Sequence, residues 1–223
     1  MDAPHTDDTR MRALAIPRAL FIYSLLYGGM TVLAGVLAFK QVQLYPTGLA
    51  VEAGIFAFLI LVVISSTVAQ LYGEKLANRL VLWGFVPLAV SIALIGLVLA
   101  LPASPDMNPD WLTSFETVLS QTPRIMAAGP VAYGVSLLLN VWIFSRLRGS
   151  GETNTFGLMI RGAIASALSQ AIDSVIFITL AFYGEFPITN LLIGQIIAKV
   201  TLSLVLVPFL ITAGVKLARA IDR

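Results

Sequence analysis

The residues best suited to chemistry interrupt an otherwise hydrophobic stretch, residues 161–177. They are Arg161, Ser166, Ser169, Gln170 and Asp173. At about 100° per helical residue, the last four of them share one arc of roughly 100°. An ionisable residue inside a membrane is costly and usually faces a cavity or a partner. Asp173 is therefore the strongest candidate for a functional residue.

A second charge in an apolar segment, Lys199, offers Asp173 a partner. Each lies about ten or eleven residues from the outer end of its segment, so at about 1.5 Å per residue their depths nearly match. We expect an ion pair, which would make both charges tolerable. One interpretation is that this pair only fixes helix packing. Further polar residues at similar depth favour a binding site instead: Ser166, Gln170, Gln195 and Ser203.

Two other charged residues lie nearer the ends of their segments. Arg161 either snorkels toward the membrane surface or faces the cavity. Glu52 is expected at an interface, in contact with solvent. Ser66 and Gln70 share a helix face, but Ser hydroxyls often bond to helix carbonyls, so this signal is weak.

The polar set suits a flat, hydrogen-bonding ligand. A carboxylate can accept adjacent N–H donors, as it does from base amino groups. Gln170 and Asn140 can each donate and accept. Phe177 could stack on a flat ring, although aromatic residues in such segments more often pack or lie at membrane interfaces.

Composition limits the class of protein. The chain has 223 residues, of which 58% are hydrophobic and 12% charged, whereas a soluble domain has about 25% charged residues. There is no Cys, and the one His, His5, lies in a polar tail, so we expect no Cys/His metal site, no disulfide and no cofactor. The apolar segments lack a nucleophile–base set, which argues against an enzyme. The sequence G-x-x-x-x-G-K-[ST] does not occur, so ATP hydrolysis would need a partner.

Hydropathy predicts an all-α integral membrane protein with a single six-helix domain, residues 19–215. The expected spans are 19–39, 49–71, 80–101, 125–144, 155–183 and 188–215, with polar tails at 1–18 and 216–223. Between the third and fourth spans, Asn108-Pro109 is typical of a helix N-cap followed by Pro at the first position. We expect a short amphipathic interfacial helix in 102–124; a ligand lid is the alternative.

The placement of Lys and Arg predicts the orientation. With six spans, ten of these residues fall on the side of the termini: Arg10, Arg12, Arg18, Lys75, Arg79, Arg146, Arg148, Lys216, Arg219 and Arg223. Only Lys40 and Arg124 fall on the other side. Both termini are therefore expected in the cytoplasm, with the protein in the cell inner membrane.

Several motifs together carry a family resemblance. They are Ser169-Gln170-x-x-Asp173-Ser-x-x-Phe177 with Arg161 and Ser166 before it, Lys199, Tyr72-Gly73-x-Lys75-x-Ala77-x-Arg79, and Phe144-x-Arg146-Leu147-Arg148. With them the chain resembles the queuosine precursor transporter family, also called the vitamin uptake transporter family. The resemblance implies a six-helix inner-membrane protein that imports a 7-deazapurine, typically 7-cyano-7-deazaguanine, for queuosine in tRNA. The family is also similar to the substrate-binding components of energy-coupling-factor vitamin transporters.

The chain departs from the family pattern at two carboxylate positions. Ser66 stands where the family usually has an acidic residue, and Leu137 and Asn140 stand where it often has Gln and Asp. These departures leave the exact ligand open.

Two functions remain. In both, the expected partners are a deazapurine-like small molecule and the lipid bilayer, and no nucleic acid is expected. One is an importer acting alone, and the other is a substrate-binding subunit that needs a separate ATPase. A structural or assembly protein is a third reading, against which ligand-dependent thermal stabilisation would argue. The sequence does not specify a homo-oligomer, an energising partner or a coupling ion.

Overall fold

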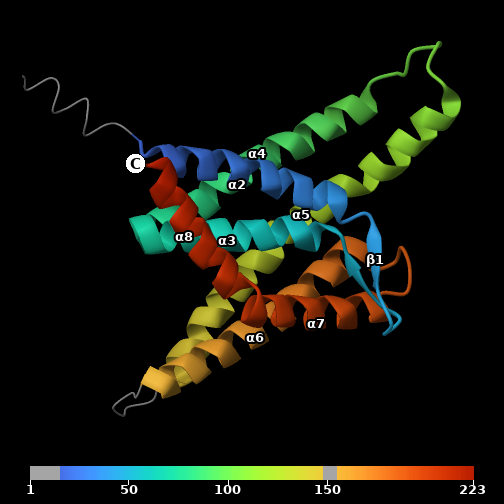
Figure 1. Ribbon diagram of the computed structural model, residues 1–223. Helices are drawn as coiled ribbons and strands as arrows, with labels where there is room; N and C mark the ends of the chain where they lie inside the picture. The colour runs from blue at the N-terminus through green and yellow to red at the C-terminus, as the bar shows by residue number, and fades with distance from the viewer. Residues whose placement is uncertain (1–15, 148–154) are drawn as a thin grey trace, which may run out of the picture.

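A computed structural model describes residues 16–147 and 155–223. Within these ranges, the side chains of 137, 138, 140–147, 155–163, 165 and 166 are not described. The elements in chain order are α2 (Arg18–Leu37), β1 (Gln41–Leu44), β2 (Leu49–Glu52), α3 (Gly54–Tyr72), α4 (Glu74–Ala100), α5 (Pro109–Leu147), α6 (Thr155–Phe182), α7 (Thr189–Val205) and α8 (Val207–Ile221). The described chain is mostly helical, as the composition predicted (Figure 1).

Among the described residues, three helices are long and apolar enough to cross a membrane: α2, α3 and α4. The helices α7 and α8 are also long and apolar enough when taken together, although they meet at a bend of 51°. If this pair is one span, the described residues contain four. The expected span 188–215 falls on these two helices, which meet at the bend. Pro208 lies in the first turn of α8, where a missing N–H is tolerated, and this placement explains why α8 starts there.

A β-hairpin replaces the expected start of the second span. β1 and β2 pair antiparallel, from Gln41 opposite Glu52 to Leu44 opposite Leu49, and α3 starts only at Gly54. The prediction of a helix from Leu49 is wrong. Apolar residues suit a buried strand as well as a helix when the run is this short. β2 packs against α7 so closely that a Cβ atom on Gly194 would overlap the carbonyl oxygen of Ala50.

The segment after the third span forms one long helix. Its predicted start is confirmed, because the backbone N–H of Asp110 donates to Asn108 Oδ1 at 2.9 Å. The predicted separate interfacial helix is wrong, because α5 runs through Pro123 and Pro130 without a break. At 1.5 Å per residue its 39 residues extend for about 58 Å, roughly twice the hydrocarbon thickness. Part of α5 must therefore lie outside that layer.

The first and last helices meet at one end of the molecule, where Figure 1 shows α8 beside the start of α2. The backbone N–H of Ala19 donates to Asp222 Oδ1 at 2.9 Å, and Tyr72 donates to Asp222 Oδ2 at 2.8 Å. At the other end, Arg124 on α5 donates to Glu185 Oε1 at 3.0 Å and to the carbonyl of Tyr183 at 2.7 Å. These two sets of contacts tie the helices together at opposite ends.

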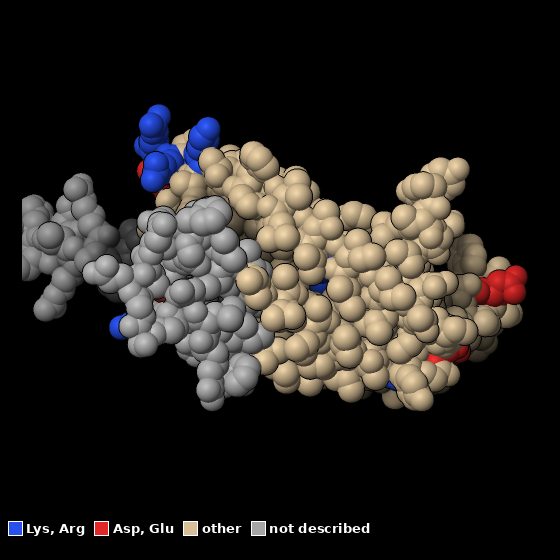
Figure 2. Space-filling view, turned by 90° about the horizontal axis from the view of Figure 1, so that it is seen from below, with Lys and Arg blue, Asp and Glu red and all other residues tan. Residues whose placement is uncertain are grey.

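Charged residues are also distributed unequally between the two ends. On the face in Figure 2, Lys and Arg atoms gather at one end and Asp and Glu atoms at the other, with a largely uncharged surface between them. The helices α2 and α4 also carry exposed large apolar side chains, such as Leu25, Leu82, Trp83 and Leu97. An apolar girdle of this kind is what a lipid bilayer covers.

Candidate functional site

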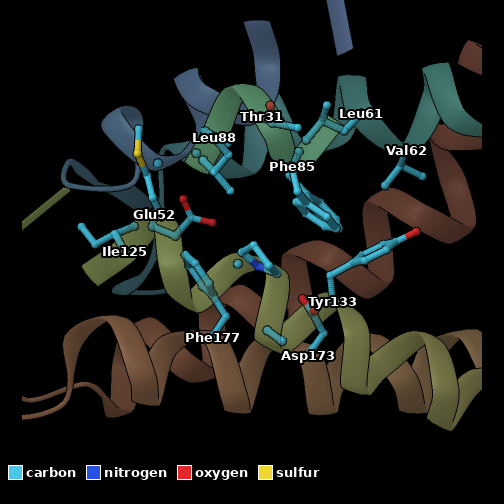
Figure 3. A pocket seen from close by; sticks show the side chains of 18 of the residues that line it. Thr31, Glu52, Leu61, Val62, Phe85, Leu88, Ile125, Tyr133, Asp173 and Phe177 are labelled. Atoms are coloured by element: carbon cyan, nitrogen blue, oxygen red, sulfur yellow. The ribbon is translucent and has the colours of Figure 1, made fainter. Parts of the chain in front are cut away.

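A cavity lies inside the helices and holds the predicted ion pair in its wall. Residues of α2, α3, α4, α5, α6 and α7 line it, together with Glu52 at the end of β2. Its volume is about 110 Å³. Most of the lining is apolar or aromatic, with Tyr27, Phe58, Phe85, Tyr133 and Phe177 among it (Figure 3). A predominantly apolar and aromatic lining with a few charged groups is typical of a small-molecule site.

Asp173 and Lys199 form a buried ion pair, as the matched depths predicted. Lys199 Nζ lies 2.6 Å from Asp173 Oδ2, and their side chains are only 5% and 8% exposed. The ammonium group also lies 4.4 Å from the ring centroid of Phe58 and 5.6 Å from that of Phe177. Aromatic faces attract a cation and need no water to do so. The lysine is therefore held by one carboxylate and two rings.

The second oxygen of Asp173 has a weaker donor. Ser136 Oγ lies 3.3 Å from Asp173 Oδ1 and 3.0 Å from the carbonyl oxygen of Tyr133. A hydroxyl has one proton to give, so these two acceptors share it. Asp173 Oδ1 keeps capacity for a further donor, and the carboxylate is partly available to a ligand.

Glu52 is the main correction to the sequence analysis. It was expected in solvent at an interface, but it is 3% exposed and lines the cavity. Gln195 Nε2 donates to Glu52 Oε1 at 2.6 Å, and the backbone N–H of Glu52 lies 3.3 Å from Gln195 Oε1. The hairpin carries Glu52 inward, because β2 packs on α7 at the turn of helix that holds Gln195. Hydropathy could not predict this hairpin, because such short apolar strands cannot be told from the start of a helix.

The other predicted residues divide into three groups. Phe177 lines the cavity with Asp173 and Lys199. Ser169, Gln170 and Gln195 lie nearby but not in the lining: Ser169 is buried, Gln170 donates to Ser203 Oγ, and Gln195 holds Glu52. The side chains of Asn140, Arg161 and Ser166 lie outside the described residues.

Ser66 is not in the lining either. Its neighbour Ser65 lines the cavity instead, with its hydroxyl donating to the carbonyl of Val62 at 3.1 Å. Helical rotation of about 100° per residue separates the two side chains. Thr31, on α2, was missed by the sequence analysis; its hydroxyl donates to the carbonyls of Gly28 and Gly84.

The arrangement can bind a flat, partly polar molecule. The aromatic side chains offer faces for stacking, and one ammonium and two carboxylates offer a donor and acceptors. Within residues 16–147 and 155–223, no group of three or more His, Cys, Asp or Glu side chains could hold a metal ion.

Known proteins are similar to this chain in sequence. A protein-family model described as "Putative vitamin uptake transporter" matches residues 52–213, which include Glu52, Asp173 and Lys199. A curated protein of Bacillus subtilis (strain 168), named "Probable queuosine precursor transporter", is 27% identical over 186 residues, covering 82% of this chain and 79% of the relative. No solved structure matches the chain. Since the family model covers well over half of the sequence, the chain belongs to the family of vitamin uptake transporters.

Proposed function

We propose that this protein imports a 7-deazapurine precursor of queuosine, such as 7-cyano-7-deazaguanine, and performs no chemistry on it. The membership of a transporter family and the name of the Bacillus relative support transport of a small molecule. The observation that carries the proposal is the Asp173–Lys199 pair, buried in the wall of a largely apolar cavity. Intramembrane charges that face a cavity commonly mark a substrate or ion pathway.

The connections between the helices support a chain that crosses the membrane back and forth. α2 and α3 are joined by the hairpin at one end, and α3 and α4 by the single residue Gly73 at the other. The contacts of Asp222 with Ala19 and Tyr72 keep α8 beside the start of α2. If α7 and α8 form one broken passage, six passages result, with both termini on the same side. We propose the cytoplasmic side of the inner membrane for them, from the excess of Lys and Arg there.

Asp173→Asn tests this function. Asn keeps the size and one acceptor oxygen but loses the charge that balances Lys199, and it presents an N–H donor toward the ligand. Losing one partner of a buried charged hydrogen bond costs about 2–5 kcal/mol, roughly 30-fold or more in affinity. We expect uptake of 7-cyano-7-deazaguanine into proteoliposomes to be abolished, with the helix content and the monodispersity of the purified variant preserved.

Asp106→Asn is the matched control, because it makes the same chemical change at an exposed residue before α5. Its uptake should equal that of the unchanged protein. Unchanged ligand affinity in Asp173→Asn, measured by calorimetry on matched samples, would remove Asp173 from the site. Ligand binding without uptake in liposomes that contain only this protein would favour the alternative, a substrate-binding subunit that depends on a separate ATPase.

A further inference from the structure

One carboxylate oxygen of Glu52 receives no hydrogen bond from the described residues. Oε1 accepts from Gln195, but Oε2 is fully buried and receives no hydrogen bond from the described part of the chain. Figure 3 shows the carboxyl group of Glu52 directed into the cavity. Leaving a buried acceptor without a donor costs free energy, more for a charged group than for a neutral one. The position of Oε2 suggests that something entering the cavity supplies the donor.

The start of α3 lies beside the second carboxylate oxygen of Glu52. Oε2 lies beside the first turn of α3, so close that a Cβ atom on Gly54 would be 2.6 Å from it. The backbone N–H groups at a helix N-terminus favour a negative charge. Glycine at position 54 therefore leaves the room that the carboxylate occupies, and the helix start holds an acceptor at the cavity wall.

Charge is unbalanced around the cavity. Its described lining contains two carboxylates, Glu52 and Asp173, and one cation, Lys199. The other ionisable lining groups are the phenols of Tyr27 on α2 and Tyr133 on α5. Lys199 is in direct contact with Asp173, at 2.6 Å. Glu52 is thus the carboxylate whose charge is less compensated.

The two carboxylates differ in what they can still accept. Both oxygens of Asp173 have donors, Lys199 on one and the shared hydroxyl of Ser136 on the other. Glu52 has a whole oxygen available, and Gln195 fixes the orientation of the group through Oε1. The exocyclic amino group of an amino-pyrimidinone ring is an N–H donor that matches the one available oxygen.

We propose that Glu52 Oε2 binds the amino-pyrimidinone edge of the substrate and so selects guanine-type over hypoxanthine-type rings. This inference rests on the proposed function and deepens it. It assigns the donor edge to Glu52, leaving Asp173 and Lys199 to contact the rest of the molecule. Gln195 acts as a positioning residue, because it bonds to Glu52 and does not line the cavity.

The assignment is tested by removing one side-chain charge and one ligand group, separately and together, and comparing the affinities. Affinities for 7-cyano-7-deazaguanine and for its analogue without the exocyclic amino group are measured by calorimetry, for the unchanged protein and for Glu52→Gln. We expect the unchanged protein to prefer the amino-bearing ring by roughly 30-fold or more, the scale of a lost buried charged hydrogen bond. In Glu52→Gln this preference should fall to within about threefold. Glu74→Gln, the same change at an exposed residue of α4, should keep the full preference.

A purely structural role for Glu52 predicts a different result: both affinities would fall together and the preference would survive, which overturns the proposal. A preference below about threefold in the unchanged protein also overturns it, without any variant. If Glu52→Gln does not fold, Glu52→Asp goes through the same cycle, because it keeps the charge but withdraws it by one methylene from the edge. Failure of both ligands to bind the unchanged protein would contradict the proposed function itself, whereas equal binding of both contradicts only the role of Glu52.

Discussion

Lys199 shows how a single charge can be kept in an apolar interior. Its ammonium group contacts one carboxylate oxygen and faces the rings of Phe58 and Phe177. A buried pair stabilises a fold only weakly compared with apolar residues of the same size, yet removing one member is strongly destabilising. The presence of the pair is therefore weak evidence for a role in stability.

The first prediction concerns this pair. Lys199→Met keeps an unbranched side chain one atom shorter and leaves Asp173 without its cation, so we expect a loss of about 3–5 kcal/mol in the free energy of unfolding. Adding Asp173→Asn should recover part of that loss, because the stranded charge is then gone. Unfolding in detergent, monitored by helix content against denaturant, measures both.

Lys216→Met serves as the control, since Lys216 is exposed on α8 and its replacement should change stability little. If the losses in unfolding free energy of Asp173→Asn and Lys199→Met simply add in the double variant, the two side chains do not interact. The assigned ion pair would then be wrong. A non-additive result is the signature of direct contact.

At the same scale, the sequence predicted the contact between Asp173 and Lys199 and missed the buried position of Glu52. Asp173 and Lys199 could be paired because both lie on helices whose rise per residue converts sequence position into depth. Glu52 could not be placed in this way. Its position depends on a hairpin that folds back onto α7, a contact between residues 143 positions apart.

At the scale of elements, the hairpin is the feature that shapes the polar end of the cavity. Its strands are four residues each, too short for their pattern to be told from a helix start. Burial decides between the two: Val51 and Glu52 are buried, and Ala50 lies against α7 at Gly194. The absence of a side chain at Gly194 lets the strand approach the helix backbone.

The second prediction tests this close approach. Gly194→Ala would drive a methyl group into the backbone of Ala50, so α7 and β2 must separate. Overpacking of this kind costs about 1–3 kcal/mol. We expect a lower melting temperature, and weaker ligand binding because Gln195 would no longer hold Glu52.

Gly96→Ala is the matched control, because a methyl group there meets nothing within 4 Å. Alanine is favoured over glycine inside a helix by about 0.5–1 kcal/mol, so this variant should be as stable as the unchanged protein or more so. A Gly194→Ala protein with an unchanged melting temperature would show that β2 and α7 do not pack as described.

The helices illustrate which sequence signals were reliable. The start of α5 followed from Asn108 and Pro109, since a cap acts locally through the side chain that makes it. The two prolines farther along did not end α5, because a proline costs one hydrogen bond but packing against neighbours can outweigh the loss. α5 makes its largest set of contacts with α6, which explains how the long helix is held.

At the scale of the whole molecule, the two ends differ in charge and in what closes them. Asp222 joins the first and last helices at one end, and Arg124 joins α5 to the turn after α6 at the other. Lys75, Arg79, Lys216 and Arg219 are exposed on the elements that meet near Asp222. A basic end of this kind is expected to face the cytoplasm.

The last prediction is the orientation of the whole molecule. The chain contains no Cys, so a single introduced Cys is the only site that a thiol reagent can label. Ser114 and Asn78 are both exposed, Ser114 near the start of α5 and Asn78 in the second turn of α4. They should lie on opposite sides of the membrane, because α4 runs between the two ends of the molecule.

We therefore expect Ser114→Cys to react with a membrane-impermeant maleimide added outside intact cells, and Asn78→Cys to react only after the membrane is opened. Both should react equally in detergent, which controls for the reactivity of the thiol itself. The reverse pattern would mean that the basic end faces outward and that the orientation is inverted. Labelling of both from the same side would contradict the passage of α4 across the bilayer, and with it the proposal that the cavity lies within the membrane.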